Sequence, residues 1–357
     1  MLAVPRITPD QAEEIALKYY GINGSAQRLA AEHDDTFHIA TPAGPSQLLK
    51  ISALDEPADA PVSFPTSVLL HLASAAPALP VQRTTATLDG APEMRISAGP
   101  ARLVRMTTWL DGKLLAAAAT TAEQRRDIGA TLARLSIALR GFTHPAARRT
   151  HLWDLQNFGN RRALLNELPP SGLLPEVEQA LGGDRQALAA GLRRGLDDCL
   201  DRFNSLVRPQ LAETAVQVIH TDFHGHNLLT DGTQITGILD FGDALTGPVA
   251  MDIGVAACYQ LGSGADPLRP ALDVVAGYHA VDPLSAADLA LAAEFIVARV
   301  AARIIVSQWN AIRDPANREY LLRRTPQAIE HLAALRLLSP DEIARSLRKA
   351  CGTPTGM

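Results

Sequence analysis

The stretch Val218–Asp243 has the sequence VIHTDFHGHNLLTDGTQITGILDFGD, which combines apolar runs with a dense polar cluster. An apolar entry leads into the cluster, and two further apolar runs flank Asp231-Gly232. An Asp-Gly pair between apolar runs predicts a β-hairpin. The hairpin would hold Asp222 and Asn227, which lie in the cluster, at a fixed separation from Asp240 beyond its second strand. Two carboxylates and a carboxamide would therefore converge from two backbone segments.

These three side chains match the requirements of phosphoryl transfer from a nucleotide. Asp222 would position a hydroxyl and take its proton, while Asn227 and Asp240 would supply oxygen ligands to a Mg²⁺ that bridges the phosphates. The order His220-x-Asp222-x-x-x-x-Asn227, followed by Asp240-Phe241-Gly242, is that of the kinase catalytic loop and metal-binding motif. Two separate motifs at a compatible spacing make this match specific.

Three other interpretations of the polar cluster stay open at this point. His220, His224 and His226 could form a metal cluster with Asp222, although neither an H-E-x-x-H motif nor a Cys pair accompanies them and Asn227 would then lack a role. The cluster could also be a polar turn that caps a strand. The third interpretation is a kinase fold that has lost its activity.

On these motifs the chain resembles the aminoglycoside phosphotransferase and choline kinase group of small-molecule kinases. Thr221 replaces the Arg with which protein kinases contact an activation-loop phosphate, and no long loop follows Asp240. The resemblance implies an α+β, protein-kinase-like bilobal fold. Residues 1–110 would form a nucleotide-binding lobe around a five-stranded antiparallel sheet, and residues 111–357 a mainly helical catalytic and substrate-binding lobe. It also implies Mg²⁺, with ATP or GTP as phosphate donor.

The first 110 residues carry the pattern expected of such a nucleotide-binding lobe. Thr8-Pro9 predicts the start of a helix that ends before Gly21. Strands are predicted at 26–31, 37–41, 47–51, 81–87 and 101–106. Lys50, on the third strand, would hold the nucleotide phosphates. Residues 33–37 would cover the phosphates, which assigns Asp34, Asp35 and Thr36 to the nucleotide, and backbone groups from Met106 to Leu110 would meet its purine.

The predicted helix 63–74 departs from the kinase pattern because it contains no acidic residue to pair with Lys50. The nearest acids precede it, at Asp55, Glu56 and Asp59. Either one of these acids reaches back to Lys50, or the nucleotide alone holds the lysine. This departure is the main argument for reduced or altered activity.

The remainder of the chain has mostly helical patterns. Thr121 and Gln124 form a predicted capping box before the helix 122–139. Asp252 is expected to cap the helix after the metal-binding motif and to brace the catalytic loop. The apolar stripe within 286–337 predicts a buried helical face.

Composition bounds the functional classes. A formal net charge of −5 over 357 residues shows no basic footprint, so nucleic acid is not an expected partner. The three cysteines lie far apart in the sequence and predict reduced thiols in a cytoplasmic protein. The N-terminal sequence lacks the pattern of a signal peptide, and the Ala-rich run 115–120 is too short to cross a membrane.

A finer resemblance concerns the acceptor. The segments Tyr19-Tyr20-Gly21, 34–39, 49–51 and 299–321 resemble the hydroxylysine kinase branch, which implies that hydroxylysine is the acceptor. Other branches stay open as alternatives, namely homoserine, choline or ethanolamine, aminoglycoside and methylthioribose kinases, as does a nucleotide-binding pseudokinase.

An acceptor with ammonium groups requires carboxylates and aromatic faces nearby. The residues proposed for this role are Trp153, Asp154, Asp243 and Trp309, with Glu294 as a further carboxylate. Either tryptophan could instead be a core aromatic. Arg303 could bind an α-carboxylate or be a charge on the surface of a helix.

Overall fold

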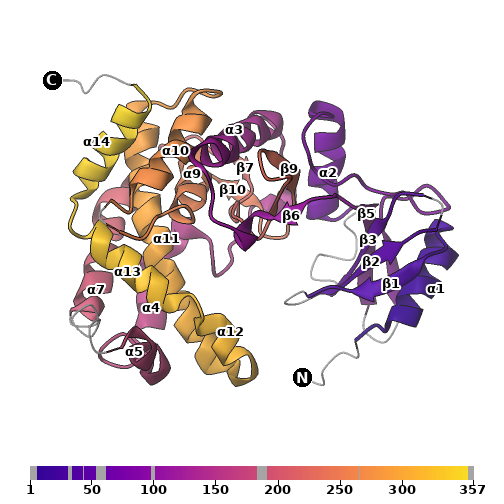
Figure 1. The fold of residues 1–357 in the computed structure, drawn as a ribbon, viewed down its shortest axis with the longest axis horizontal. Helices are drawn as coiled ribbons and strands as arrows, with labels where there is room; N and C mark the ends of the chain where they lie inside the picture. Colours follow the sequence, from indigo (N-terminus) through magenta and orange to yellow (C-terminus); the bar gives the residue numbers. More distant parts are fainter. Residues whose placement is uncertain are drawn as a thin grey trace.

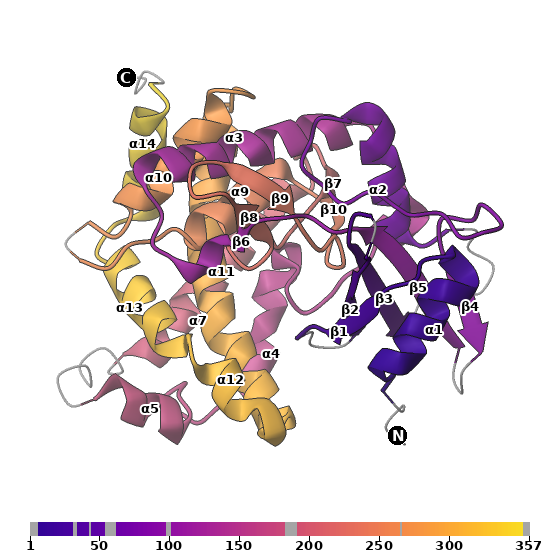
Figure 2. The same ribbon diagram turned by 45° about the vertical axis from the view of Figure 1, so that its right-hand side comes forward.

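The computed structural model describes residues 6–30, 34–42, 44–53, 62–97, 101–182, 191–264 and 266–352. A smaller N-terminal part built on an antiparallel sheet lies beside a larger, mainly helical part (Figures 1 and 2). The predicted α+β class with an antiparallel N-terminal sheet is therefore confirmed. Within the described ranges, each helix is too short or too polar to cross a membrane.

The N-terminal sheet has five strands in the order β1-β2-β3-β5-β4, and every neighbouring pair is antiparallel. The strands are β1 (Ser25–Arg28), β2 (Asp35–Ala40), β3 (Gln47–Ala53), β4 (Met94–Ser97) and β5 (Ala101–Thr108). The number of strands is confirmed, but the prediction of a strand at 81–87 is wrong. That segment crosses between the two parts of the protein, so Val81 bridges Ile238 while Thr84 bridges Thr107.

Helix α1 (Pro9–Tyr20) packs on one face of this sheet. Thr8 is the N-cap at the predicted helix start and forms a capping box with Gln11, and Gly21 ends the helix with a φ of 68°. The apolar side chains Ile15, Phe37 and Leu49 lie in the core between helix and sheet. Side chains on neighbouring positions of a strand point to opposite faces, so Thr36 and Lys50, which pair across β2 and β3, face away from α1.

Helix α2 (Phe64–Ala75) occupies the place of the predicted helix 63–74, but it packs with the other part of the molecule. Phe64, Val68 and Leu72 are fully buried in the core of the helical part, separate from the core under α1. The acid-free sequence of α2 therefore fits its surroundings, because this face of the helix contacts apolar side chains.

The helical part is organised around α11 (Ala286–Arg313), whose neighbours are α9 (Val249–Cys258), α12 (Arg318–Leu322), α13 (Thr325–Leu335) and α14 (Pro340–Ala350). Helix α3 (Ala122–Leu139) packs on α10 (Arg269–His279), and its capping box is formed as predicted. The other helices among the described residues are α4 (Arg162–Leu165), α5 (Pro175–Leu181), α7 (Leu192–Arg202) and α8 (Arg208–Leu211). Short turns of other types are η1 (Leu115–Ala117), η2 (Pro145–Ala147), η3 (Leu155–Arg161), η5 (Phe203–Val207) and η6 (Pro315–Asn317).

The predicted hairpin is present. Strands β8 (Leu228–Thr230) and β9 (Ile235–Ile238) are antiparallel and are joined through Asp231-Gly232. Strand β6 (Lys113–Leu114) adds to β8, while β7 (Gln217–Ile219) pairs with β10 (Leu245–Gly247). The sheet of the N-terminal part ends at Thr108, and β6 joins the hairpin. A lobe boundary near residue 110 stays a prediction, and it falls in the link between these two sheets.

Candidate active site

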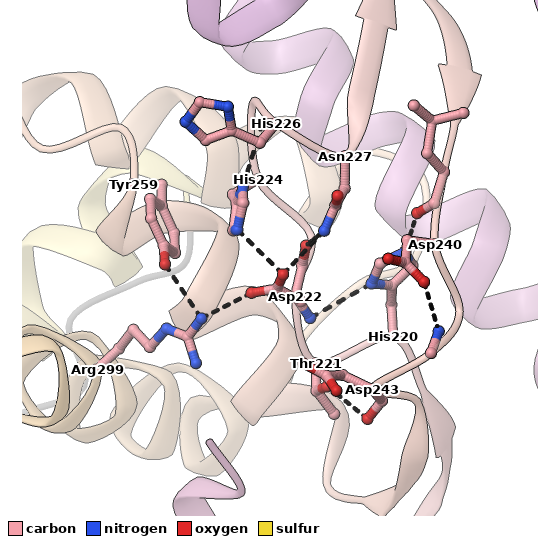
Figure 3. Close-up of polar contacts among 12 residues, drawn as sticks. His220, Thr221, Asp222, His224, His226, Asn227, Asp240, Asp243, Tyr259 and Arg299 are labelled. Carbon is pink, nitrogen blue, oxygen red and sulfur yellow. Dashed lines mark hydrogen bonds and ion pairs between the residues drawn. The ribbon is translucent and has the colours of Figure 1, made fainter. Parts of the chain in front are cut away.

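The loop between β7 and β8 is held in an unusual backbone conformation. Thr221 has a φ of 66°, which is uncommon for a β-branched residue. The Asp252 carboxylate accepts the backbone N–H groups of His220 at 2.8 Å and of Thr221 at 2.6 Å. The Thr221 hydroxyl also donates to the backbone carbonyl of Asp243 at 2.8 Å (Figure 3). These bonds over-determine the strained residue and stabilise the loop.

Asp252 thus braces the loop as predicted, but its predicted role as a helix cap is wrong. The N-cap position of α9 is Pro248, and Asp252 lies in the first turn of the helix. Burial raises the pKa of this carboxyl despite the hydrogen bonds from His220 and Thr221. The observed hydrogen bonds therefore make Asp252 a structural residue of the loop.

Asp222 lies at the centre of the polar contacts (Figure 3). Its Oδ1 accepts from Arg299 Nη2 at 2.7 Å, while its Oδ2 lies 3.1 Å from His224 Nε2 and 2.8 Å from Asn227 Nδ2. Burial acts to raise the pKa of Asp222, but His224 and Arg299 outweigh it and hold the pKa well below its ordinary value. The carboxylate is therefore ionised at neutral pH and can accept a hydrogen bond from a hydroxyl.

Asn227 and Asp240 are brought together by the hairpin. The Leu239 N–H donates to the Asn227 carbonyl at 2.8 Å, and Asp240 is the residue that follows Leu239. Asp240 has a φ of 56°, and its Oδ1 accepts from the Gly242 N–H at 2.9 Å. Desolvation opposes the charged form of Asp240, yet Lys50 and the Gly242 N–H hold its pKa below the ordinary value.

This donor set fits Mg²⁺. Because Asn227 Nδ2 is bonded to Asp222, its carboxamide oxygen is left for a metal, and the Asp240 side chain is half exposed. Two hard oxygen donors from the protein leave the remaining positions for phosphate and water. The histidine alternative has no support, since His220 Nε2 donates to the Leu239 carbonyl at 2.9 Å. Among the described residues no group of three His, Cys, Asp or Glu side chains could hold a metal.

Lys50 links the N-terminal sheet to this constellation. Its Nζ lies 3.0 Å from Asp34 Oδ2 and 3.4 Å from Asp240 Oδ1. Asp34, in the bend before β2, therefore pairs with the lysine that α2 leaves without an acid. Asp55, Glu56, Asp59 and His33 lie outside the described residues. The position of Asp34 beside the strand that pairs with β3 is the sequence signal that could have identified this partner.

Two predicted nucleotide contacts are wrong. Asp35 points to the α1 side of the sheet, where its carboxylate binds Arg28 at 2.7 Å and Arg102 at 3.0 Å. Met106 is fully buried in the core under α1, and its carbonyl accepts the Thr85 N–H at 2.9 Å. Both residues therefore stabilise the sheet. Thr36, which faces the same side as Lys50, and the half-buried Leu110 stay predictions.

The predicted acceptor residues separate into two groups. Trp153 lies beneath the Arg299 guanidinium, 4.8 Å from its ring centre, and so belongs to the surroundings of Asp222. Asp154 instead caps η3, accepting from the Gln156 N–H at 3.0 Å and the Asn157 amide at 2.8 Å, so its predicted role is wrong. Asp243 contributes its carbonyl to the loop, and a contact of its carboxylate with the acceptor stays a prediction.

Trp309 does not join this cluster. It follows Arg299 by ten residues on α11, which corresponds to about 15 Å along a helix. Its indole N–H donates to Glu167 at 3.1 Å, and Arg313 stacks on its ring. Glu294 is likewise occupied, by Arg202 at 2.6 Å. The prediction of an acceptor contact for Trp309 is therefore wrong.

Sequence reasoning missed the role of Arg299. This residue stands in the apolar stripe of α11, and only 2% of it is exposed. A charged residue inside such a stripe was the available signal, because a buried charge requires a partner. Tyr259 was also missed, and its hydroxyl accepts from Arg299 at 3.1 Å.

Comparisons with known proteins bear on the family and the fold. The family model of the Phosphotransferase enzyme family matches residues 25–295. The hydroxylysine kinase of Danio rerio is 27% identical over 354 residues, which cover 96% of this chain and 95% of that protein.

Two solved structures share the fold. A microcompartment-associated aminopropanol kinase has a TM-score of 0.59 at 20% identity, covering 94% of this chain and 97% of its own. Spectinomycin phosphotransferase in complex with ADP and spectinomycin has a TM-score of 0.63 at 14% identity, covering 97% and 99%. The predicted kinase-like fold is thereby confirmed.

Proposed function

Because the chain belongs to the Phosphotransferase enzyme family, we propose that it transfers the γ-phosphate of ATP or GTP to the hydroxyl of a small amine or amino acid. Hydroxylysine is the first acceptor to test, since hydroxylysine kinase is a relative over nearly the whole chain. The proposal is carried by two contacts, Lys50 to Asp240 at 3.4 Å and Asn227 to Asp222 at 2.8 Å. A backbone hydrogen bond from Leu239 to Asn227 joins the two segments that carry them.

On the donor side, Lys50 would bind the phosphates, and Asp34 would hold its ammonium group through their ion pair. Thr36 would contact the phosphates from the same face of the sheet as Lys50. Leu110 would contact the purine from the link between the two parts. Asn227 and Asp240 would hold Mg²⁺, which when bound would neutralise charge on the phosphates. The ADP of spectinomycin phosphotransferase supports a nucleotide as donor. The nucleotide lobe would comprise residues 1–110, and the catalytic lobe residues 111–357.

On the acceptor side, Asp222 would accept a hydrogen bond from the hydroxyl and aim its oxygen at the phosphate. A carboxylate of such low basicity suits phosphoryl transfer, in which the bond to the leaving oxygen is largely broken before the nucleophile is deprotonated. Trp153, which stacks with Arg299, would form one wall of the acceptor site. The Asp243 carboxylate would lie near the acceptor's ammonium group.

The proposed test is a coupled assay of ATP and GTP, with Mg²⁺, against a panel of acceptors. The panel contains hydroxylysine, homoserine, choline, ethanolamine, an aminoglycoside and methylthioribose. We expect turnover with a hydroxylated amino acid or amine and expect hydroxylysine to give the highest kcat/KM. Nucleotide binding without turnover on any member would instead favour a pseudokinase, the runner-up function.

Asp240→Asn is the matched control for this assay. It removes the charge that the metal requires, so turnover should collapse while nucleotide binding without Mg²⁺ changes little. Isothermal titration with nucleotide in the presence and absence of Mg²⁺ separates these two effects. Full turnover in Asp240→Asn would place the metal elsewhere.

A further inference from the structure

Helix α11 presents two guanidinium groups to one aromatic ring beside Asp222. Arg299 and Arg303 are one helical turn apart, and their guanidinium carbons lie 5.4 and 4.8 Å from the ring centre of Tyr259. Only 2% and 7% of these two arginines is exposed. Like charges at this spacing repel each other, and burial increases the cost because little water screens them.

The acidic groups around this cluster do not balance its charge. Asp222 pairs with Arg299, but His224 shares the same carboxylate. In the part of the chain that the structure describes, no carboxylate forms a salt bridge with Arg303 or with Arg324, which follows α12. Arg299 and Arg303 share the Tyr259 ring, and burial and the charge of Arg303 both lower the pKa of Arg324. The cluster of Arg299, Arg303 and Arg324 therefore carries excess positive charge, and Arg299 joins it to the carboxylate that would position the nucleophile.

Two donors of Arg299 and one ring nitrogen of the nearby His226 also lack a partner. Arg299 Nε and Nη1 are enclosed by protein without a hydrogen-bond acceptor, as is His226 Nε2. Unpaired buried donors destabilise a protein, and they are retained where a ligand supplies the missing acceptors.

We infer that Arg299, Arg303 and Arg324 form a receptor for the carboxylate of the acceptor, so that the acceptor is a hydroxylated amino acid. This inference rests on the proposed function and specifies its substrate class. Guanidinium groups bind carboxylates through paired hydrogen bonds in a planar geometry. Because Arg299 is bonded to Asp222 itself, a carboxylate held here would lie within a short side chain's length of the reacting hydroxyl.

The nucleotide phosphates are the other source of negative charge, and the geometry argues against them. Figure 3 shows Arg299 and Tyr259 on one side of Asp222 and Asp240 on the other. Lys50, at 3.4 Å from Asp240, marks that second side as the phosphate side. The arginine cluster therefore faces the acceptor rather than the donor.

The test uses matched acceptors that differ only in the carboxylate. Hydroxylysine is compared with its decarboxylated diamine, and homoserine with aminopropanol, at saturating nucleotide and Mg²⁺. One of the two amino acids will be the better substrate of the wild type. For that pair we expect kcat/KM of the amino acid to exceed kcat/KM of its amine by about 10- to 100-fold, the range of a charged hydrogen-bonded contact.

Arg303→Gln should reduce this preference to near one, mainly by raising KM for the amino acid, while KM for the nucleotide stays unchanged. Arg303→Lys, which keeps the charge but loses the planar pair of donors, should give an intermediate preference. Arg313→Gln, on the same helix but paired with Glu167, is the matched control and should keep the wild-type preference. The melting temperature of Arg303→Gln should rise, because an uncompensated buried charge is removed.

The outcomes distinguish the inference from the proposed function. Equal or better turnover of the amines by the wild type overturns the carboxylate receptor and leaves the kinase in place. A shift in nucleotide KM in Arg303→Gln assigns the cluster to the phosphates and also overturns it. If no member of either pair is phosphorylated, the result contradicts both the inferred hydroxylated amino acid and the acceptor class of the proposed function. If Arg303→Gln does not fold, two other measurements test the carboxylate receptor: the preference of the wild type for the amino acids, and the preference of Arg324→Gln, which replaces a half-buried arginine.

Discussion

The carboxylate of Asp222 is shared between a buried arginine and the place where an acceptor hydroxyl would lie. Its Oδ1 is 2.7 Å from Arg299 Nη2, and that arginine is almost completely buried. Replacing Asp222 therefore removes a proposed catalytic group and also leaves a buried cation unpaired. A loss of stability is expected whichever role is correct, so melting temperature alone does not distinguish them.

Asp222→Asn should lower kcat by about 100- to 10,000-fold, because a carboxamide cannot accept the proton. KM for the nucleotide should stay nearly unchanged, since the proposed phosphate site at Lys50 and Asp240 does not include this residue. The double variant Asp222→Asn, Arg299→Met, in which no cation is left unpaired, should recover stability without recovering turnover. Measuring kcat and thermal unfolding on the same preparations checks this. Recovery of turnover with stability would show that Asp222 only braces the loop.

Adjacent aspartates offer a second contrast at the same scale. Asp34→Asn should raise KM for the nucleotide about two- to fivefold, the range for a partly exposed ion pair, because Lys50 loses one of its anchors. Asp35→Asn should leave that KM unchanged but lower the free energy of unfolding by about 3 kcal/mol, because Arg102 loses a buried partner. Nucleotide titration and urea unfolding of both variants test the assignment, which the opposite pattern would overturn.

Among the elements, the catalytic loop and the segment after β9 both depend on a residue with positive φ. Thr221 has a φ of 66°, and its N–H donates to Asp252 of α9. Asp240 has a φ of 56°, and its carboxylate accepts from the Gly242 N–H in its own segment. Asp252 of α9 makes the link between the helical core and the loop. The geometry of the site is thus set by a buried helix rather than by the loop alone.

Asp252→Asn should disturb this link, because its amide N–H₂ would face one of two backbone N–H groups. We expect a loss of about 1–3 kcal/mol in unfolding free energy and a fall in kcat of about 100-fold from misplacement of Asp222. Asp273→Asn is the control, since this buried aspartate binds Arg125 at 2.8 Å between α3 and α10. That variant should lose stability but keep the kcat of its folded fraction. Equal effects on kcat would remove the special role of Asp252.

The absence of an acid from α2 is also explained at the level of elements. Its apolar residues belong to the core of the helical part, while the sheet that carries Lys50 is packed by α1. The pairing function therefore moves to Asp34, at the start of β2. The missing helix acid is accordingly no sign of lost activity.

For the whole molecule, the pH dependence of stability should report two histidines, the half-buried His226 and the buried His331. Burial and nearby cations lower the pKa of His226 and of His331 from 6.5 to about 4. In the unfolded chain both bind protons below about pH 6.5, while the folded protein keeps them neutral until about pH 4. Stability should therefore fall as pH falls through this window.

Thermal unfolding between pH 7 and pH 4 tests this expectation in the wild type, His226→Gln and His331→Gln. Each variant should show a shallower fall in melting temperature than the wild type. Burial raises the pKa of Asp252, so its protonation in the folded protein makes stability rise as pH falls. The difference between the wild-type and variant curves therefore isolates the contribution of each histidine. Parallel curves for all three proteins would contradict the assignment.

The sequence by itself determined the elements that depend on local patterns. Thr8-Pro9 and the capping box at Thr121 predicted two helix starts, and Asp231-Gly232 predicted the hairpin, because these signals act within a few residues. The order of Asp222, Asn227 and Asp240 also indicated the chemistry before any contact was known. The segment 81–87 was misjudged because its hydrogen bonds go to two different sheets.

Only the tertiary structure decided the partners of charged groups. Whether Asp34 or Asp35 meets Lys50 depends on strand register, which turns neighbouring residues to opposite faces. Arg299 lies on α11, 77 residues beyond Asp222, and nothing local in either segment specifies their contact. Long-range packing brings Arg299 of α11 to Asp222 of the catalytic loop, and the pair is stable because a buried charge requires an opposite partner.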